Sequence, residues 1–261
     1  MHTIHISSKD VRTDLIIEQE NLDIKSEKKI EEGLKVEETT HQNHHYTTIY
    51  FDDITDSSLF QKVQKVFIKE LKEYLKVSQD DHFLIIGLGN EKSTPDSLGP
   101  STIQNILVTR YLSLFNSLEE GYSNVAVFTP NVMGNTGIET SDIIQNIIDA
   151  VGANKIIVID ALSTNHLERL GKTIQITDQG IVPGSGVGNI RKEFSKETIH
   201  KEVIAIGIPT VISLCKIQKN ISHSFMVTPT NIDFLIERFS ILLGEGINVS
   251  LHKNYIRQNN F

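Results

Sequence analysis

Ile156-Ile-Val-Ile-Asp-Ala-Leu162 contains four consecutive aliphatic residues followed directly by an aspartate. An unbroken Val/Ile run without polar alternation is typical of a strand that is buried on both faces of a sheet. Three further runs of this kind are present: Phe83-Leu-Ile-Ile86, Val125-Ala-Val-Phe128 and Val203-Ile-Ala-Ile206. These four runs predict the strands of a buried parallel sheet.

Segments with helical periodicity separate the runs. Apolar residues recur every three or four positions in four segments, 59–76, 103–114, 144–151 and 232–243. The segment 46–51 is rich in β-branched and aromatic residues and predicts one additional strand. Strands that alternate with helices in this way indicate an α/β fold with three layers, a mostly parallel sheet with helices on both faces.

Composition restricts the class of protein. The chain has 261 residues, and its 33 Asp and Glu outnumber 25 Lys and Arg, which gives a formal net charge of −8. This acidity argues against direct nucleic-acid binding through the overall field, and the absence of a ~20-residue apolar run argues against a membrane protein. The single Cys215 and the lack of a secretory signal fit a cytoplasmic protein. The charge-dense residues 18–45 predict a loosely ordered surface segment.

Two aspartates follow predicted strands. In parallel sheets, functional residues gather beyond the carboxyl ends of the strands. Asp160 follows one run directly, and Asp96 lies in the loop 87–100, where Thr94-Pro95 predicts a helix start with Thr94 as its cap. Two carboxylates at one sheet edge can share a proton and activate water, or they can hold a divalent metal with a third ligand.

Two other loops are expected at this edge. The segment 131–140 supplies Asn135 and Glu139. The segment 173–191 predicts a glycine-rich loop whose backbone amides can clamp an extended peptide or polarise a carbonyl group. Its candidate substrate-binding residues are Gly184, Ser185, Gly186 and Gly188. Ser185 lacks the helix pattern that follows a nucleophilic serine, which disfavours a serine hydrolase.

Together the loops resemble the germination protease family. The resemblance is carried by ordered strings over most of residues 81–250, including Gly-Leu-Gly-Asn (87–90), Thr-Pro-Asp (94–96), Gly-x-Thr-Gly-Ile-Glu-Thr (134–140), Ile-Asp-Ala-Leu (159–162), Leu-Glu-Arg (167–169) and Pro-Gly-Ser-Gly-Val-Gly-Asn (183–189). Ala-Ile-Gly-Ile-Pro-Thr-Val (205–211) and Met-Val-Thr-Pro (226–229) continue it.

The resemblance implies a function. Members of this family are atypical endopeptidases that degrade small acid-soluble spore proteins in the spore core, with a fold similar to that of hydrogenase maturation proteases. They assemble as homotetramers and are made in the forespore as zymogens that remove their own pro-segment. The positions of Asp96 and Asp160 are those of the family's proposed catalytic pair. No cofactor is implied, although a divalent metal stays possible because related maturation proteases bind one.

The N-terminal tail resembles the family's self-cleavage region. Arg12-Thr-Asp-Leu15, followed by Glu18, is similar to the Thr-Glu-(Phe/Ile)-Ala-x-Glu site of the spore proteins, with Ile16 where alanine is usual. This match predicts cleavage between Asp14 and Leu15. Residues 1–14 are then the pro-segment, and 15–261 form a single peptidase domain. Two alternatives are a catalytically weak relative with a regulatory or binding role, and a metal-dependent endopeptidase of the maturation type.

Overall fold

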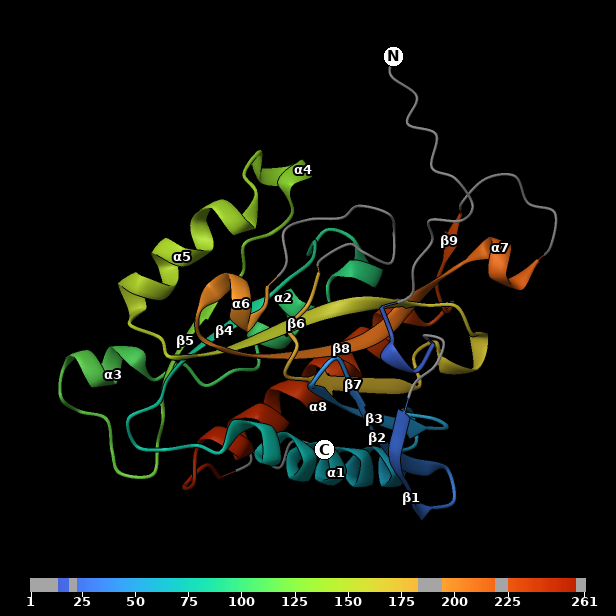
Figure 1. Cartoon of the computed structure of the whole chain (residues 1–261), viewed down its shortest axis with the longest axis horizontal. Coiled ribbons are helices and arrows are strands. Elements are labelled where there is room, and N and C mark those ends of the chain that lie inside the picture. Colours follow the sequence, from blue (N-terminus) through green and yellow to red (C-terminus); the bar gives the residue numbers. More distant parts are fainter. Residues whose placement is uncertain (1–13, 19–22, 183–193, 219–224, 257–261) are drawn as a thin grey trace.

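The computed structural model describes residues 14–18, 23–182, 194–218 and 225–256. It shows a nine-stranded mixed sheet with helices on both faces (Figure 1). Apart from β9, which pairs only with β8, the strands lie in the order β1-β2-β3-β7-β8-β6-β4-β5. The predicted α/β class is therefore confirmed.

The parallel part of the sheet is formed by the four predicted strands. They are β4 (His82–Gly87), β5 (Asn124–Phe128), β6 (Lys155–Thr164) and β8 (Glu202–Ser213). Successive residues of β6 enter two different cores: Ile157 and Ile159 face one, whereas Ile156 and Val158 face the other. Burial on both faces explains why these strands appear in the sequence as continuous apolar runs.

An antiparallel part extends the sheet. It contains β1 (Asp23–Glu31), β2 (Leu34–His41), β3 (His44–Phe51) and β7 (Thr173–Thr177), while the short β9 (Met226–Val227) pairs with β8. The strand predicted at 46–51 is confirmed as part of β3.

Two expectations about this part were wrong. Residues 23–31 and 34–41 are paired strands and not loosely ordered, because Leu34 and Val36 alternate with charged residues and bury one face of β2. The stretch 173–191 is not loop throughout: its first five residues form β7, and all five are buried.

Two long helices cover one face of the sheet. α1 (Ser57–Leu75) packs against α8 (Ile232–Leu251), with Phe67 and Phe239 fully buried between helices and sheet. The Asp56 carboxylate caps α1 by accepting a 2.6 Å hydrogen bond from the Leu59 N–H. Among the described helices, none combines the length and apolar content needed to cross a bilayer.

The opposite face is covered by α5 (Thr140–Val151) and α6 (Lys196–Ile199). Ile144 and Ile148 of α5 and Ile199 of α6 belong to a second core that includes Leu84 and Ile86 of β4. A core on each side of the sheet gives the three layers that the alternation of strands and helices predicted. The short elements are η1 (Ile16–Glu18), η2 (Thr94–Asp96), α4 (Met133–Thr136), η3 (Leu167–Arg169) and α7 (Leu214–Ile217).

The single helix predicted over 103–114 is wrong. α2 (Leu98–Ile103) ends where that helix should begin, and α3 (Arg110–Leu114) is separate. Tertiary hydrogen bonds hold the residues between them. The Leu107 N–H donates to Asn248 Oδ1 at 2.9 Å, and the Thr109 hydroxyl donates to the Ser123 carbonyl at 2.6 Å.

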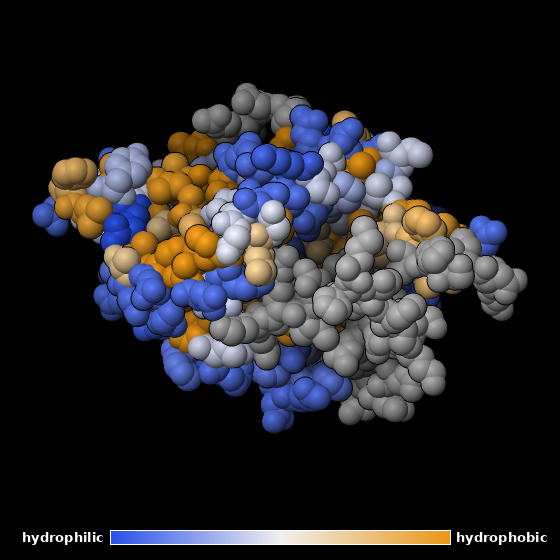
Figure 2. Space-filling view, turned by 90° about the horizontal axis from the view of Figure 1, so that it is seen from above, coloured by the Kyte–Doolittle hydropathy of each residue, from blue (hydrophilic) through white to orange (hydrophobic). Residues whose placement is uncertain are grey.

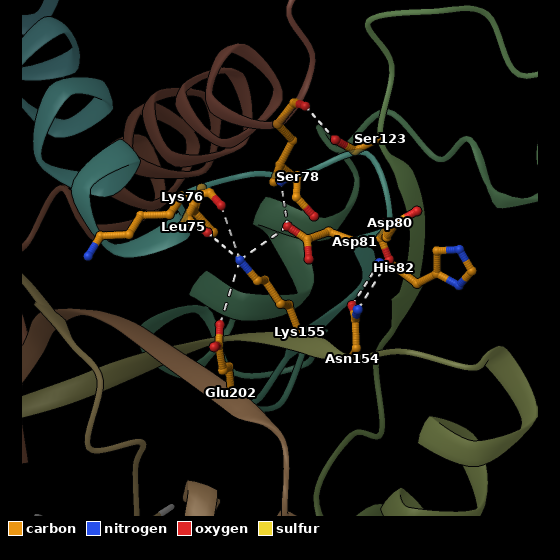
Figure 3. A network of polar contacts seen from close by, with 11 residues as sticks. Leu75, Lys76, Ser78, Asp80, Asp81, His82, Ser123, Asn154, Lys155 and Glu202 are labelled. Carbon is orange, nitrogen blue, oxygen red and sulfur yellow. Dashed lines mark hydrogen bonds and ion pairs between the residues drawn. The ribbon is translucent and has the colours of Figure 1, made fainter.

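A buried charge network fixes the amino ends of the parallel strands (Figure 3). Lys155 Nζ donates to the Leu75 carbonyl at 2.6 Å and lies 3.1 Å from Asp81 Oδ2 and 3.6 Å from Glu202 Oε2. The Lys155 and Asp81 side chains are 13% and 7% exposed. The network joins the end of α1 to the beginnings of β4, β6 and β8, so the opposite, carboxyl ends of these strands are held in a common register.

Candidate active site

A cavity of about 360 Å³ lies at the carboxyl edge of the parallel strands. Its walls come from the loop after β4, the loop after β5, and the last residues of β6 and of β8. The lining includes four acidic residues, which are Asp14, Asp96, Glu139 and Asp160. The cavity is therefore at the sheet edge where the strand pattern predicted functional residues.

Gly89 allows the loop after β4 to close around Asp96. Its φ is +115°, and a Cβ atom at this position would stand 2.0 Å from the Asp96 carbonyl oxygen. That carbonyl accepts a 2.8 Å hydrogen bond from the Asn90 N–H. Only glycine adopts this conformation readily and leaves room for the contact. The backbone of Asp96 is thus fixed by its own loop.

A second contact fixes the same turn from β8. The Thr210 hydroxyl donates a 2.6 Å hydrogen bond to the Pro95 carbonyl, and the Thr228 hydroxyl donates to the Thr210 carbonyl at 2.8 Å. The expected helix start at Thr94 was wrong in detail. Thr94 is the first residue of the three-residue 3₁₀ helix η2, which is preceded by Ser93 and has no side-chain cap.

Asp160 lies inside β6 and is 7% exposed. Its Oδ1 accepts a 2.9 Å hydrogen bond from the Ala161 N–H. The structure thus brings Asp96 and Asp160, which are far apart in the sequence, to the wall of one cavity. Two carboxylates on a common cavity can divide the roles of general base and general acid toward a water molecule.

The N-terminal segment 14–18 enters this site. Asp14 lines the cavity, and its Oδ2 accepts hydrogen bonds from the Ser163 N–H at 2.8 Å and the Ser163 hydroxyl at 3.0 Å. Leu15 and Ile16 are buried, with exposures of 0% and 2%. The side chain of Gln175 accepts from the Ile16 N–H at 2.8 Å and donates to the Asp14 carbonyl at 3.3 Å. A polar side chain therefore holds the backbone on both sides of the Asp14–Leu15 bond.

Glu18 anchors the other end of this segment. Its carboxylate accepts hydrogen bonds from the Thr164 hydroxyl and from the Asn165 N–H, the latter at 2.7 Å. Arg169 Nη1 lies 3.1 Å from Glu18 Oε1, and the Glu18 side chain is 0% exposed. A buried carboxylate needs such partners to remain charged.

The other predicted site residues have different outcomes. Glu139 lines the cavity, whereas Asn135 holds the neighbouring loops, donating to Asn90 Oδ1 and Asn131 Oδ1 at 2.9 Å each. The four remaining predictions lie outside the described residues: Gly184, Ser185, Gly186 and Gly188. In the described residues flanking that loop, Ile181 and Phe194 pair their backbones, and Phe194 lines the cavity.

Sequence reasoning missed Ser163, Arg169, Gln175 and Thr210 as site residues. Ser163 follows Asp160 by three positions on the same strand, and because side chains alternate between the two faces of a strand, this spacing did not indicate a shared site. Arg169 lies within the string 167–169, which contributes to the family resemblance, but it carried no assigned role. Gln175 is placed by the long-range pairing of β7 with β8, and Thr210 is placed by β8, which also pairs with β6; no local signal exists for either pairing.

No group of three or more His, Cys, Asp or Glu within the described part of the chain is arranged to hold a metal ion. His166, for example, pairs with Glu168 at 3.3 Å outside the cavity. Among the described residues, the two aspartates are therefore not part of a group of side chains that could hold a metal ion.

Hydrophobic side chains are exposed near the cavity. In Figure 2, hydrophobic atoms gather on the left half of the face, the side on which Figure 1 places α3, α4 and α5. Met133 and Ile138, which are 49% and 50% exposed, lie in the same loop region as the cavity residues Val132 and Glu139. An apolar rim of this kind suits contact with an extended peptide.

Known proteins resemble this chain over most of its length. The sequence profile of the germination protease family matches residues 3–221. A germination protease of Bacillus mycoides (strain KBAB4) is 40% identical over 93% of this chain and 71% of its own length. Those of Geobacillus sp. (strain WCH70) and Bacillus cereus (strain G9842) are 44% and 39% identical, over 53% and 71% of their own lengths. The chain therefore belongs to the germination protease family, a family of peptidases.

Proposed function

We propose that this protein is the endopeptidase that begins the degradation of small acid-soluble spore proteins in the spore core during germination. One observation carries the proposal: Asp14 of the chain's own N-terminal segment lines the cavity that Asp96 and Asp160 also line, and hydrogen bonds to Ser163 and Gln175 hold the segment there. A peptidase site should hold a peptide in this way. The sequence of the segment resembles the cleavage site of the spore proteins, and the relatives are named germination proteases.

The proposed reaction is an aspartate-assisted hydrolysis. One carboxylate of the Asp96–Asp160 pair takes a proton from a water molecule, whose oxygen attacks the carbonyl carbon of Asp14. The other carboxylic acid donates a proton to the Leu15 nitrogen as the peptide bond breaks. Gln175 Nε2 already donates to the carbonyl oxygen that gains negative charge, at 3.3 Å. The products are a new carboxylate at Asp14 and a new amine at Leu15.

We further propose that the chain is a zymogen. Residues 1–14 are the pro-segment, residues 15–261 are the peptidase domain, and the Asp14–Leu15 bond is cut by the protein itself. Two polar anchors, at Asp14 and at Glu18, support this assignment, as does the burial of Leu15 between them. Ile16 is 2% exposed, so the site accepts a side chain larger than the usual alanine.

The family resemblance also implies a homotetramer, which we propose for this chain. α3 and the residue after it expose Tyr111, Leu114 and Phe115 by 54%, 63% and 77%. Apolar side chains this exposed are frequent at subunit interfaces. Light scattering should report four chains per particle, and Phe115→Glu should reduce that number. A monomer at all concentrations would contradict this part of the proposal.

Incubation with a purified small acid-soluble spore protein tests the function. We expect discrete fragments cut after an acidic residue, and no fragments with the Asp160→Asn variant. The same digestion after dialysis against a chelator should be equally fast if the two aspartates act without a metal. Failure of the unaltered protein to cut would favour the alternative of a regulatory relative, and loss of cutting only in chelator would favour the metal-dependent alternative.

A further inference from the structure

Two acidic side chains anchor the segment 14–18, and both anchors come from the end of one strand. Ser163 holds Asp14, and Thr164 and Asn165 hold Glu18. These three consecutive residues follow Asp160 on β6 and its continuation. The separation between the candidate catalytic carboxylate and the two anchors is therefore fixed by a single piece of backbone.

The anchor around Glu18 has the character of a built binding site. The Glu18 side chain is 0% exposed, so its charge is removed from water. Arg169, which is 20% exposed, has Glu18 as its one ion-pair partner among the described residues. Arg169 Nη1 is buried and has no hydrogen-bond partner of good geometry within the described part of the chain. The negative charge of the Glu18 carboxylate therefore compensates the positive charge of Arg169. The site is suited to a carboxylate and would leave an arginine unpaired if that carboxylate were absent.

The contacts between the two anchors are of a different kind. Gln175 bonds the backbone N–H of Ile16 and the carbonyl of Asp14, groups that every peptide has. Leu15 and Ile16 have apolar side chains that are buried, and burial of this kind discriminates weakly between residues of similar size. Discrimination by charge is therefore concentrated at the two ends of the segment.

We propose that Arg169, with the Thr164 hydroxyl and the Asn165 N–H, forms the subsite that recognises an acidic side chain four residues after the scissile bond of a protein substrate. Arg169 is thus a specificity-determining residue. This inference rests on the proposed peptidase function. It also implies that Leu15–Glu18 must leave these subsites before another peptide can enter, so the chain's own segment competes with its substrate.

A competition between two synthetic peptides tests the proposal. Both reproduce residues 9–22, and one carries Gln in place of Glu18. The full chain is given both peptides together, and mass spectrometry measures the ratio of their cleavage rates. This ratio does not depend on how much enzyme is folded or on how often its own segment vacates the site. We expect a preference of about 10- to 100-fold for the Glu peptide, the effect of one hydrogen-bonded charge.

Variants locate the preference. Arg169→Met should bring the ratio close to 1, and Arg169→Lys should keep part of it. Arg238→Met removes a comparable arginine, which belongs to α8 and donates to the Ile54 carbonyl. This variant should leave the ratio unchanged. Equal cleavage of both peptides by the unaltered chain, or a preference that survives in Arg169→Met, would overturn the subsite.

Binding separates this inference from the peptidase function. The same peptides, labelled with a fluorophore, are titrated with the full-length Asp160→Asn variant, whose anchors are intact. The Glu peptide should bind more tightly than the Gln peptide, and this difference should disappear when Arg169→Met is combined with Asp160→Asn. That result supports the subsite even if no variant cleaves either peptide. Absence of cleavage contradicts the proposed function, whereas equal affinities for the two peptides contradict the subsite.

Discussion

The Thr210 hydroxyl donates a 2.6 Å hydrogen bond to the Pro95 carbonyl, across 115 residues of sequence. Thr210 belongs to β8 and Pro95 to the turn that ends in Asp96, so this bond connects the central sheet to one of the two candidate catalytic residues. Thr210 is 1% exposed, and no water competes for the contact. The position of Asp96 thus depends on a strand that is far from it in the sequence.

Thr210→Val should therefore slow cleavage at Asp14–Leu15. Valine has the size of threonine but leaves the Pro95 carbonyl without its donor, at a cost of about 1 kcal/mol in the free energy of unfolding. A displaced Asp96 should lower the rate by about 10-fold or more. Thr109→Val is the control, because Thr109 is also 1% exposed and its hydroxyl donates to a carbonyl, but it lies away from the cavity; this variant additionally loses the hydrogen bond from the Val125 N–H. An equal loss of rate in both variants would show that stability alone is responsible.

Gly89→Ala should abolish cleavage. The new Cβ atom would stand 2.0 Å from the Asp96 carbonyl, and φ at this position is +115°. The loop must open, which displaces Asp96, and the strained backbone costs about 1–3 kcal/mol of stability. Gly134→Ala serves as the control, since a Cβ there has no neighbour within 4 Å. Retention of the normal rate in Gly89→Ala would mean that Asp96 does not need this loop.

Gln175→Met should slow cleavage by about 10²- to 10³-fold, the effect of removing one donor from a carbonyl that gains charge. Its side chain also accepts from the Ile16 N–H, so binding of the segment weakens as well. Gln64→Met tests whether loss of any buried glutamine has this effect, because Gln64 is 5% exposed on α1 and does not line the cavity. Time courses of intact mass give both rates. A normal rate in Gln175→Met would remove this residue from the reaction.

His252 should make the protein less stable in acid. Burial lowers the pKa of His252 to about 4, and its Nδ1 accepts a 3.1 Å hydrogen bond from the Ser123 N–H. The unfolded chain takes up a proton near pH 6.5, whereas the folded chain does so only near pH 4. Between these values the unfolded state binds more protons, so stability falls as pH decreases, by at most about 1.4 kcal/mol per pH unit.

Urea denaturation from pH 4.5 to 7.5 measures this dependence. His252→Asn retains an acceptor for the Ser123 N–H but does not titrate, so its stability should change less with pH than that of the unaltered protein. His82→Gln changes an exposed histidine and should reproduce the unaltered curve. Identical pH dependence in His252→Asn and the unaltered protein would refute the role of His252.

The sequence predicted the central strands because their signal is local. Four continuous apolar runs became parts of β4, β5, β6 and β8, and the apolar spacing of 232–243 became part of α8. β1 and β2 were missed because their high density of charged residues is typical of a solvated segment, although Leu34 and Val36 do alternate with charged residues. The break between α2 and α3 was missed because Asn248 and Ser123, both distant in sequence, hold the backbone there.

The candidate site was predictable to the same extent. Asp96, Glu139 and Asp160 were predicted because they follow apolar runs, and all three line the cavity. Thr210 and Gln175 could not be found, since the role of Gln175 depends on antiparallel pairing that places it opposite Gly207 on β8, and that of Thr210 depends on a contact with Pro95, 115 residues away. Local patterns identify the carboxylates, and tertiary structure decides what holds them and the peptide.

The most direct test of the account follows the chain's own N-terminus. The full-length protein, and its Asp96→Asn and Asp160→Asn variants, are incubated, and intact mass with N-terminal sequencing is recorded over time. We expect the unaltered chain to lose residues 1–14 and to begin at Leu15, and both folded variants to stay whole. A variant that still produces the Leu15 terminus at the normal rate would contradict hydrolysis by this pair of aspartates.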